Sequence, residues 1–162
     1  MKIGSLKIVK ALWGEGGQAL VETALTLPML ALMLLGAFEF SRVAYAAIEV
    51  TNAARAAAQY GAMNGGGFLD TDGMLAAGNA DAGNLNNGLS WVSGYPTVAC
   101  SCSGTTQDAS CPSGKTPSGC TGSQLMVTVS VQMKYQITSI LKVPGFPTTY
   151  TVYGTASQGL LQ

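Results

Sequence analysis

Apolar and polar residues follow different patterns in different parts of the chain. Residues 19–38 are almost continuously apolar, and Glu22 is the only charged residue among them. As a helix, such a run spans about 30 Å, the thickness of a membrane hydrocarbon core. Further along, small apolar residues recur at helical spacing, namely Val43, Ala46, Ala47, Val50, Ala53, Ala54 and Ala57. We therefore predict one helix over residues 18–60, transmembrane over about 19–38 and amphipathic beyond.

The C-terminal part of the chain shows the period of two that is typical of strands. From Leu125 to Thr138, odd-numbered positions are apolar and even-numbered positions are polar, except Met126. Residues 148–157 are expected to form a second strand, with Tyr150, Val152, Gly154 and Ala156 on one face. Proline and glycine mark the connection between the two strands, which predicts an antiparallel hairpin. Its apolar face is expected to pack on the outer half of the long helix.

The middle of the chain is rich in helix and strand breakers. Gly61 is expected to end the long helix, and Asp70 to Gly73 are expected to cap a short helix over residues 74–85. A short strand over residues 91–99 is interrupted at Gly94 and Pro96.

These elements predict an α+β fold with four consecutive parts. They are a leader (1–17), the long helix (18–60), a linker with the short helix (61–90), and a β-domain (91–162) that contains a cysteine-bearing loop over residues 100–120.

Composition excludes several classes of function. Charged residues are only 10% of the 162 residues and the formal net charge is zero, so nucleic-acid binding is not expected. The chain contains no histidine, and therefore lacks the commonest general base, metal ligand and partner of a Ser or Cys nucleophile. It also contains no P-loop pattern. We predict a protein that is not an enzyme and that has no catalytic residues, cofactor or metal.

The leader indicates which way the apolar segment crosses a membrane. Lys2, Lys7 and Lys10 carry positive charge against Glu15 alone. A basic segment before a membrane span is expected to stay in the cytoplasm, which would place the C-terminal domain in the periplasm of a bacterial envelope. The alternative is a signal peptide cleaved at Ala44-Tyr45-Ala46. That site lies beyond the charged Glu39 and Arg42, so we favour an inner-membrane anchor that is not cleaved there.

All four cysteines fall within 21 residues rich in Ser, Gly, Thr and Pro: Cys100, Cys102, Cys111 and Cys120. In an oxidising periplasm an even number of cysteines predicts two disulfides. A bridge between Cys100 and Cys102 would be strained, so each is expected to pair with Cys111 or Cys120. A four-cysteine zinc site is the alternative, but the usual C-x₂-C spacing is missing.

One stretch resembles a known family. After Gly16 the chain continues GQALVETALTLPMLALMLLGAFEFSRVAY, and later NAARAAAQYGA. This pattern is similar to the TadE-like proteins of Tad (Flp) pilus systems, which are type IV pilin-like. The resemblance covers residues 15–62 closely and residues 125–158 loosely, and it implies a pilin-like arrangement of a long helix on a small antiparallel sheet.

The resemblance also assigns roles to residues near the start of the helix. It implies that a prepilin peptidase cleaves after Gly17 and leaves Gln18 as the first mature residue. Glu22, the fifth residue after the cleavage site, would then pair with the N-terminal amine of a neighbouring subunit. The alternative is that Glu22 faces water at the headgroup boundary. Pro28 would kink or open the helix, as pilin-like fibres tolerate.

The expected function is that of a minor pilin or pseudopilin that takes part in Tad-type pilus assembly through helix–helix packing. Its expected partners are the inner membrane, other pilin-like subunits, the prepilin peptidase and the pilus assembly machinery. Whether the subunit enters the extracellular fibre is left open. The alternative function is a single-pass envelope protein whose periplasmic β-domain binds a ligand or surface without any role in assembly.

Overall fold

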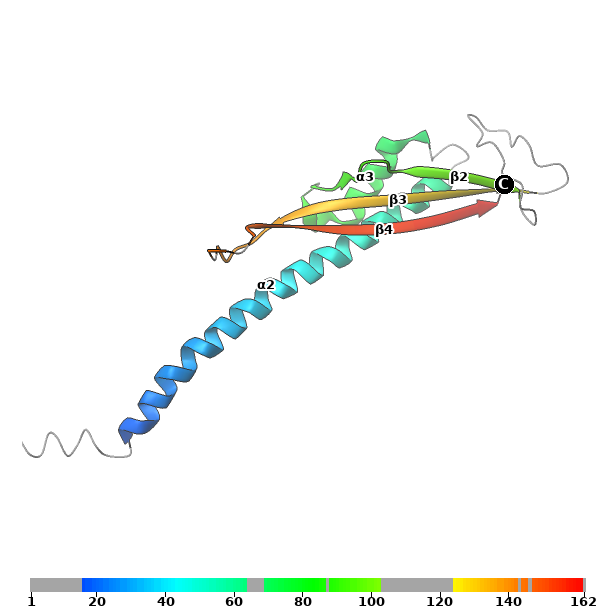
Figure 1. Ribbon diagram of the computed structural model, residues 1–162. Coiled ribbons are helices and arrows are strands. Elements are labelled where there is room, and N and C mark those ends of the chain that lie inside the picture. The colour runs from blue at the N-terminus through cyan, green and yellow to red at the C-terminus, as the bar shows by residue number, and fades with distance from the viewer. Residues whose placement is uncertain are drawn as a thin grey trace, which may run out of the picture. The chain divides into compact units, whose positions relative to one another are not determined.

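A long helix followed by a short helix and an antiparallel sheet makes up the fold of the computed structural model (Figure 1). The structure describes residues 16–63, 69–86, 88–102, 124–142, 144–145 and 147–161. The elements are α2 (Gly16–Met63), α3 (Thr71–Asp81), the 3₁₀ turn η2 (Gly83–Leu85), β1 (Ser90–Trp91), β2 (Thr97–Cys102), β3 (Leu125–Thr138) and β4 (Thr149–Leu161). The α+β class predicted from the sequence is confirmed.

The chain divides into two units within α2, Met1–Ser41 and Arg42–Gln162. In the first unit, every described large apolar side chain from Leu20 to Phe38 is exposed. Pro28 lies inside the helix without ending it.

Hydroxyl groups in the first unit bond to the backbone of α2 itself. Thr23 Oγ1 donates to the carbonyl of Ala19 over 2.8 Å, and Ser41 Oγ donates to that of Phe38 over 2.7 Å. These bonds satisfy polar groups that would otherwise be costly in an apolar solvent.

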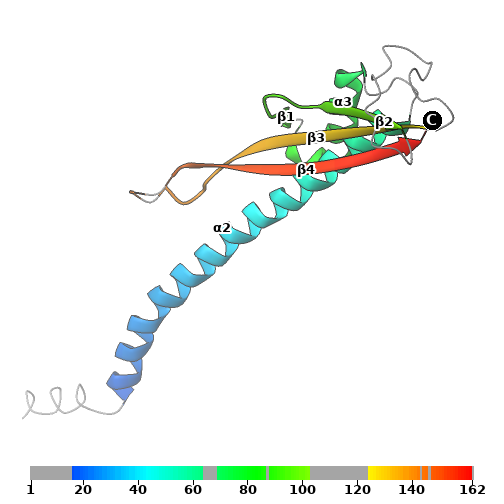
Figure 2. The same cartoon turned by 45° about the vertical axis from the view of Figure 1, so that its right-hand side comes forward.

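The second unit is built on β3, the central strand of a four-stranded antiparallel sheet. β1 and β2 follow one another along one edge of β3, with Ser90 opposite Lys134 and Thr97 opposite Ser130. β4 pairs with the other edge along its whole length, as Figure 2 shows. β4 was predicted to end at residue 157. It continues to Leu161 because β3 offers backbone partners as far as Met126.

The apolar face of the sheet is covered by the second part of α2, as the alternation predicted. The odd-numbered residues of β3 from Leu125 to Met133 are buried, and the core includes Val50, Ala53, Ala54 and Ala57 of α2.

Two glycines allow backbones to approach closely in this core. A Cβ at Gly154 of β4 would collide with the Val50 carbonyl, and one at Gly78 of α3 would lie 3.1 Å from the Ala53 carbonyl. Small residues therefore decide how near the sheet and α3 come to α2.

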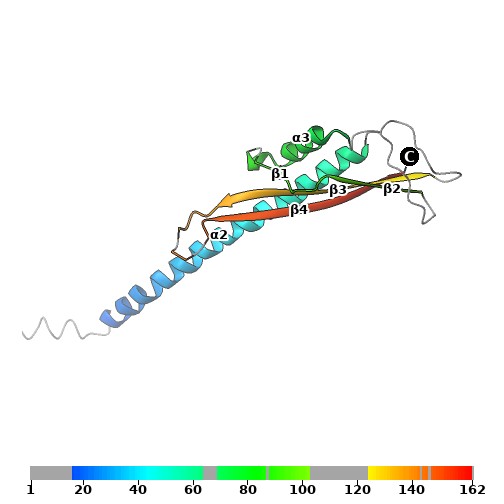
Figure 3. The same ribbon diagram turned by 45° about the horizontal axis from the view of Figure 1, so that its top comes forward.

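The short helix differs from its predicted bounds. Asp70 caps it as expected, since its carboxylate accepts a 2.8 Å hydrogen bond from the Gly73 amide. The α-helix ends at Asp81, and a 3₁₀ turn replaces its predicted last turn. Gly78 is tolerated inside the helix because α3 lies beside α2 at this point (Figure 3).

Candidate membrane and assembly segment

The residues predicted to act in membrane insertion and assembly lie in the first unit of α2. By length and composition, α2 is the one helix within the described ranges that could cross a membrane, and the most apolar window of that helix has no buried residues. Folding of this chain alone leaves the side chains from Leu20 to Phe38 without apolar cover. A membrane or neighbouring helices would supply that cover.

Gly17, Gln18 and Glu22 are all exposed near the start of this helix. Gln18 and Glu22 are four residues apart and thus on one helix face, separated by about one turn. Helix geometry therefore puts Glu22 about one turn from Gln18, whose amine cleavage would free. The proposed roles of Gly17, Gln18, Glu22 and Pro28 stay predictions.

The predicted cleavage site is helical rather than extended. α2 begins at Gly16 and so includes the bond after Gly17. A protease cleft binds extended backbone, so this first turn would have to unwind for cleavage. Two consecutive glycines make that unwinding cheap, because each costs a helix about 1 kcal/mol relative to alanine.

Hydrogen bonds between side chains fasten α3 and η2 to α2 in the second unit. Tyr60 donates to Asp70 over 3.0 Å, and Asn84 donates to the Tyr45 hydroxyl over 2.9 Å. Hydrogen bonding to Asp70, followed by the charge of Asp70, raises the pKa of Tyr60 above its ordinary value. A hydrogen bond to Glu49 is the main cause of the raised pKa of Tyr45. The sequence pattern did not reveal these contacts, because they join residues far apart in the chain.

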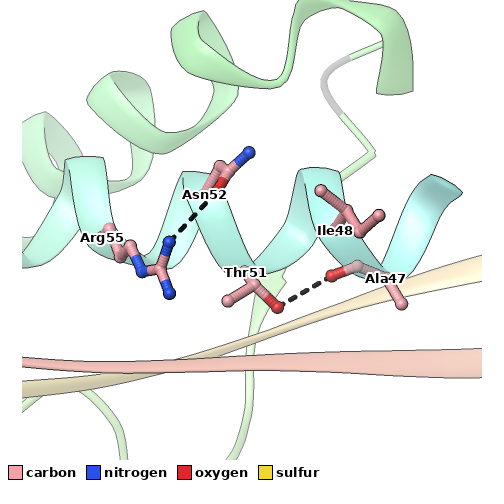
Figure 4. Close-up of a pocket in the computed structure, with 5 residues that line it drawn as sticks. All are labelled: Ala47, Ile48, Thr51, Asn52 and Arg55. Carbon is pink, nitrogen blue, oxygen red and sulfur yellow. Dashed lines mark hydrogen bonds between the residues drawn. The ribbon is translucent and has the colours of Figure 1, made fainter. Parts of the chain in front are cut away.

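A small open groove runs along one flank of α2 in the same unit (Figure 4). Its volume is about 320 Å³, and its lining residues are Ala47, Ile48, Thr51, Asn52 and Arg55. Arg55 bonds to the side chain of Asn52 over 3.5 Å, and Thr51 bonds to the Ala47 carbonyl over 2.8 Å. From the sequence, only the large apolar Ile48 among the small residues of this part of α2 could have indicated the groove.

Two of the predicted disulfide cysteines lie on β2. Cys100 and Cys102 are buried and, being two residues apart on a strand, share one face of the sheet. Their expected partners, Cys111 and Cys120, lie outside the described residues, as does the leader up to residue 15. Within the described ranges, no group of three or more His, Cys, Asp or Glu side chains could hold a metal ion.

Comparison with known proteins bears on the first part of the chain. No curated protein and no solved structure matches this chain. Residues 17–59 match the family model described as TadE-like protein, and these residues form most of α2. The resemblance seen in the sequence is thereby confirmed over this helix, where residues 17–59 are similar to the TadE-like family.

Proposed function

We propose that this protein is a pilin-like subunit, a minor pilin or pseudopilin, that is anchored in the bacterial inner membrane and takes part in assembly of a Tad-type pilus. The observation that carries the proposal is the first unit of α2, where a TadE-like segment exposes its large apolar side chains over a membrane length. The role is structural, not enzymatic. Helix packing, with no chemical step, is sufficient for it.

The proposed orientation places the leader in the cytoplasm and the unit Arg42–Gln162 in the periplasm. The lysines of the leader support it, because basic residues flanking a span are retained on the cytoplasmic side. After cleavage following Gly17, the carboxylate of Glu22 would pair with the N-terminal amine of a neighbouring subunit. A carboxylate within a span costs roughly 2.5–3.5 kcal/mol at the centre of the membrane and less near its edge, which favours such a pair.

In the periplasm, we propose that two disulfides join Cys100 and Cys102 to Cys111 and Cys120. The burial of Cys100 and Cys102 on the same face of β2 supports this arrangement. Mass spectrometry of proteolytic fragments under non-reducing conditions tests it, and reduced cysteines or a Cys100–Cys102 bridge would contradict it.

N-terminal sequencing and intact mass of the membrane-bound protein test the processing step. The chain is expected to begin at Gln18 only when a prepilin peptidase is co-expressed. A chain that begins near Ala47 would identify a signal peptide and overturn the proposal.

Glu22→Ala tests the assembly step, measured as surface pili in cells that depend on this subunit. Pilus number should fall at least about tenfold, as expected if loss of a charge-assisted contact removes about 1.5–3 kcal/mol per interface. Thr26→Ala is the matched control, because its hydroxyl bonds only within its own helix, to the carbonyl of Thr23 over 3.3 Å. Equal pilus numbers in both variants would favour an envelope protein without an assembly role.

A further inference from the structure

The two edges of the sheet differ in how well they are protected against pairing with another strand. On one side, β1 and β2 are only 2 and 6 residues long, and the chain between them contains Gly94 and Pro96. On the other side β4 runs for 13 residues, Thr149–Leu161, without a charge or a proline. Folded proteins usually protect such edges with lysine, proline, bulges or short strands. β4 has none of these protections.

The backbone groups of β4 that face away from β3 can be identified from the strand register. Thr138 lies opposite Thr149, and the next pair is joined by a 2.8 Å bond from the Ser139 amide to the Thr148 carbonyl. Bonded pairs alternate in an antiparallel ladder, so the even-numbered residues of β4 bond to β3. The odd-numbered residues from Thr149 to Leu161 direct their N–H and C=O groups outward.

A hydrogen bond on the edge of β3 opposite to β4 gives the same assignment of bonded and unbonded residues in β4. Gln132 lies opposite Thr155 in the register. Its carbonyl accepts a 3.0 Å bond from the Val92 amide, so its backbone groups point away from β4. Thr155 therefore also belongs to the unbonded row. Among the described residues, β4 pairs with β3 alone.

The groove on α2 lies beside this free edge. Contacts at Ala53, Tyr45 and Tyr60 place α3 and η2 against one flank of α2. On a helix of 100° per residue, the groove residues Ala47, Thr51 and Arg55 form the opposite flank. Gly154 of β4 packs under Val50 and Thr51, and Figure 4 shows Thr51 and Arg55 on the side of α2 that faces β4.

A strand added to β4 would therefore contact both the unbonded backbone groups of β4 and the groove on α2. Its backbone would bond to the outward groups of the odd-numbered residues. Alternate side chains would point toward the helix side of the sheet and enter the groove. Strand-addition sites work in this way: the ladder supplies affinity, and the pocket supplies selectivity for side chains.

We propose that the free edge of β4 binds an extended segment of another polypeptide as a fifth strand. The residues of this segment that face the groove are apolar beside Ala47 and Ile48 and acidic beside Arg55. Charge complementarity argues for the acid, since Arg55 carries the only charge in the groove and its hydrogen bond there is to the neutral Asn52. All of these residues belong to the unit Arg42–Gln162, so the site is independent of the membrane-spanning part of the proposed function.

Amide hydrogen exchange of the full chain in detergent micelles tests whether the edge is free. Amides of Val152 and Ala156 should exchange slowly, whereas those of Thr151, Thr155 and Ser157 should exchange about 100-fold faster or more. Slow exchange at Thr151, Thr155 and Ser157 in the dilute protein would mean that this chain already covers the edge. Slow exchange that appears only as protein concentration rises would identify a second copy as the occupant. Either result overturns the proposal.

The binding probe is a short acetylated and amidated peptide in which valine and threonine alternate and the valine near one end is replaced by glutamate. Added peptide should slow exchange at the odd-numbered positions of β4 by about tenfold or more and leave Val152 unchanged. The same peptide N-methylated at the amides that would bond to β4 keeps every side chain but should give no protection. Equal protection by both peptides, or none by either at millimolar concentration, would overturn the proposal.

Reversing the charge at the groove tests the role of Arg55. Arg55→Glu should weaken binding of the glutamate peptide about tenfold and strengthen binding of a peptide that carries lysine at the same place. Lys134→Glu is the matched control, because Lys134 lies on β3, opposite Tyr153 on the face away from the helices. Equal changes in the two variants would contradict the assignment of the groove.

Discussion

The two parts of α2 form one continuous helix but have opposite chemistry. Up to Ser41, the large apolar side chains are exposed, and the described unit offers them no cover. From Arg42 onward, the apolar residues are mostly alanine, and Val50, Ala53, Ala54 and Ala57 are completely buried. Large exposed side chains require apolar surroundings from outside the chain, whereas small buried ones let the sheet and α3 pack closely.

The buried residues of α2 therefore act in folding, and the exposed apolar ones are available for interaction. Substitutions of buried residues in the second part should act on the stability of the unit Arg42–Gln162. Substitutions in the first part should act on membrane insertion and on contacts with neighbours, and they should leave the folded unit intact. Paired variants of similar chemistry, one in each region, can test this division.

The largest expected effect on folding comes from the core under the second part of α2. Met133 of β3 is 0% exposed, and Met33 of α2 is 65% exposed. Met133→Ala should lower the free energy of unfolding by about 2–5 kcal/mol through loss of burial and creation of a cavity. Met33→Ala should change it by no more than about 0.5 kcal/mol. Urea titration of the full chain in micelles measures both, and equal losses would contradict the division.

A lysine introduced at an exposed position should have its larger effect in the first part of α2, and the effect should be on membrane insertion. Leu32→Lys, at a residue 70% exposed in the first part, should cost about 2.5–3.5 kcal/mol of membrane insertion. Ile48→Lys, at a residue 60% exposed in the second part, should leave insertion unchanged. The measurement is the fraction of each variant that remains in membranes after extraction at alkaline pH. If Ile48→Lys were extracted as readily as Leu32→Lys, the assignment of the span would be wrong.

A smaller effect is expected where α3 is capped and fastened to α2. Asp70→Ala removes the cap bond to Gly73 and the bond from Tyr60, and should destabilise the unit by about 1 kcal/mol. The same change should lower the pKa of Tyr60 toward its ordinary value of about 10, since Asp70 is the main cause of its rise. Ultraviolet absorbance titration of the tyrosines measures this shift, and Asp72→Ala is the control that should leave it unchanged.

The raised pKa of Tyr60 also sets the direction of a pH dependence. The folded state holds the phenolic proton more tightly than the unfolded chain, in which the pKa is about 10. The contribution of this bond is complete below that value and is lost as the pH rises through the higher folded pKa. The wild-type protein should therefore lose slightly more stability than Asp70→Ala between neutral and strongly alkaline pH. A parallel loss in both proteins would show that the bond contributes nothing.

The sequence by itself determined the class of the main elements, α2, β3 and β4, and the face that each would bury. The period of two in residues 125–138 predicted β3 to the residue, and the small-residue stripe predicted which side of α2 meets the sheet. The apolar run and its TadE-like pattern likewise predicted the membrane-length helix and the candidate residues Gly17 and Glu22. These features could be predicted because periodicity and turn residues are local signals.

Only the tertiary structure decided how the elements meet. The extension of β4 to Leu161 and the link between Tyr45 and Asn84 both depend on residues distant in sequence. Gly154 illustrates the limit: its place on the apolar face of a strand was evident, but its role in admitting the Val50 backbone was not. The free edge of β4 beside the groove on α2 is likewise a product of packing, because an edge and its neighbouring helix exist only once the sheet has assembled.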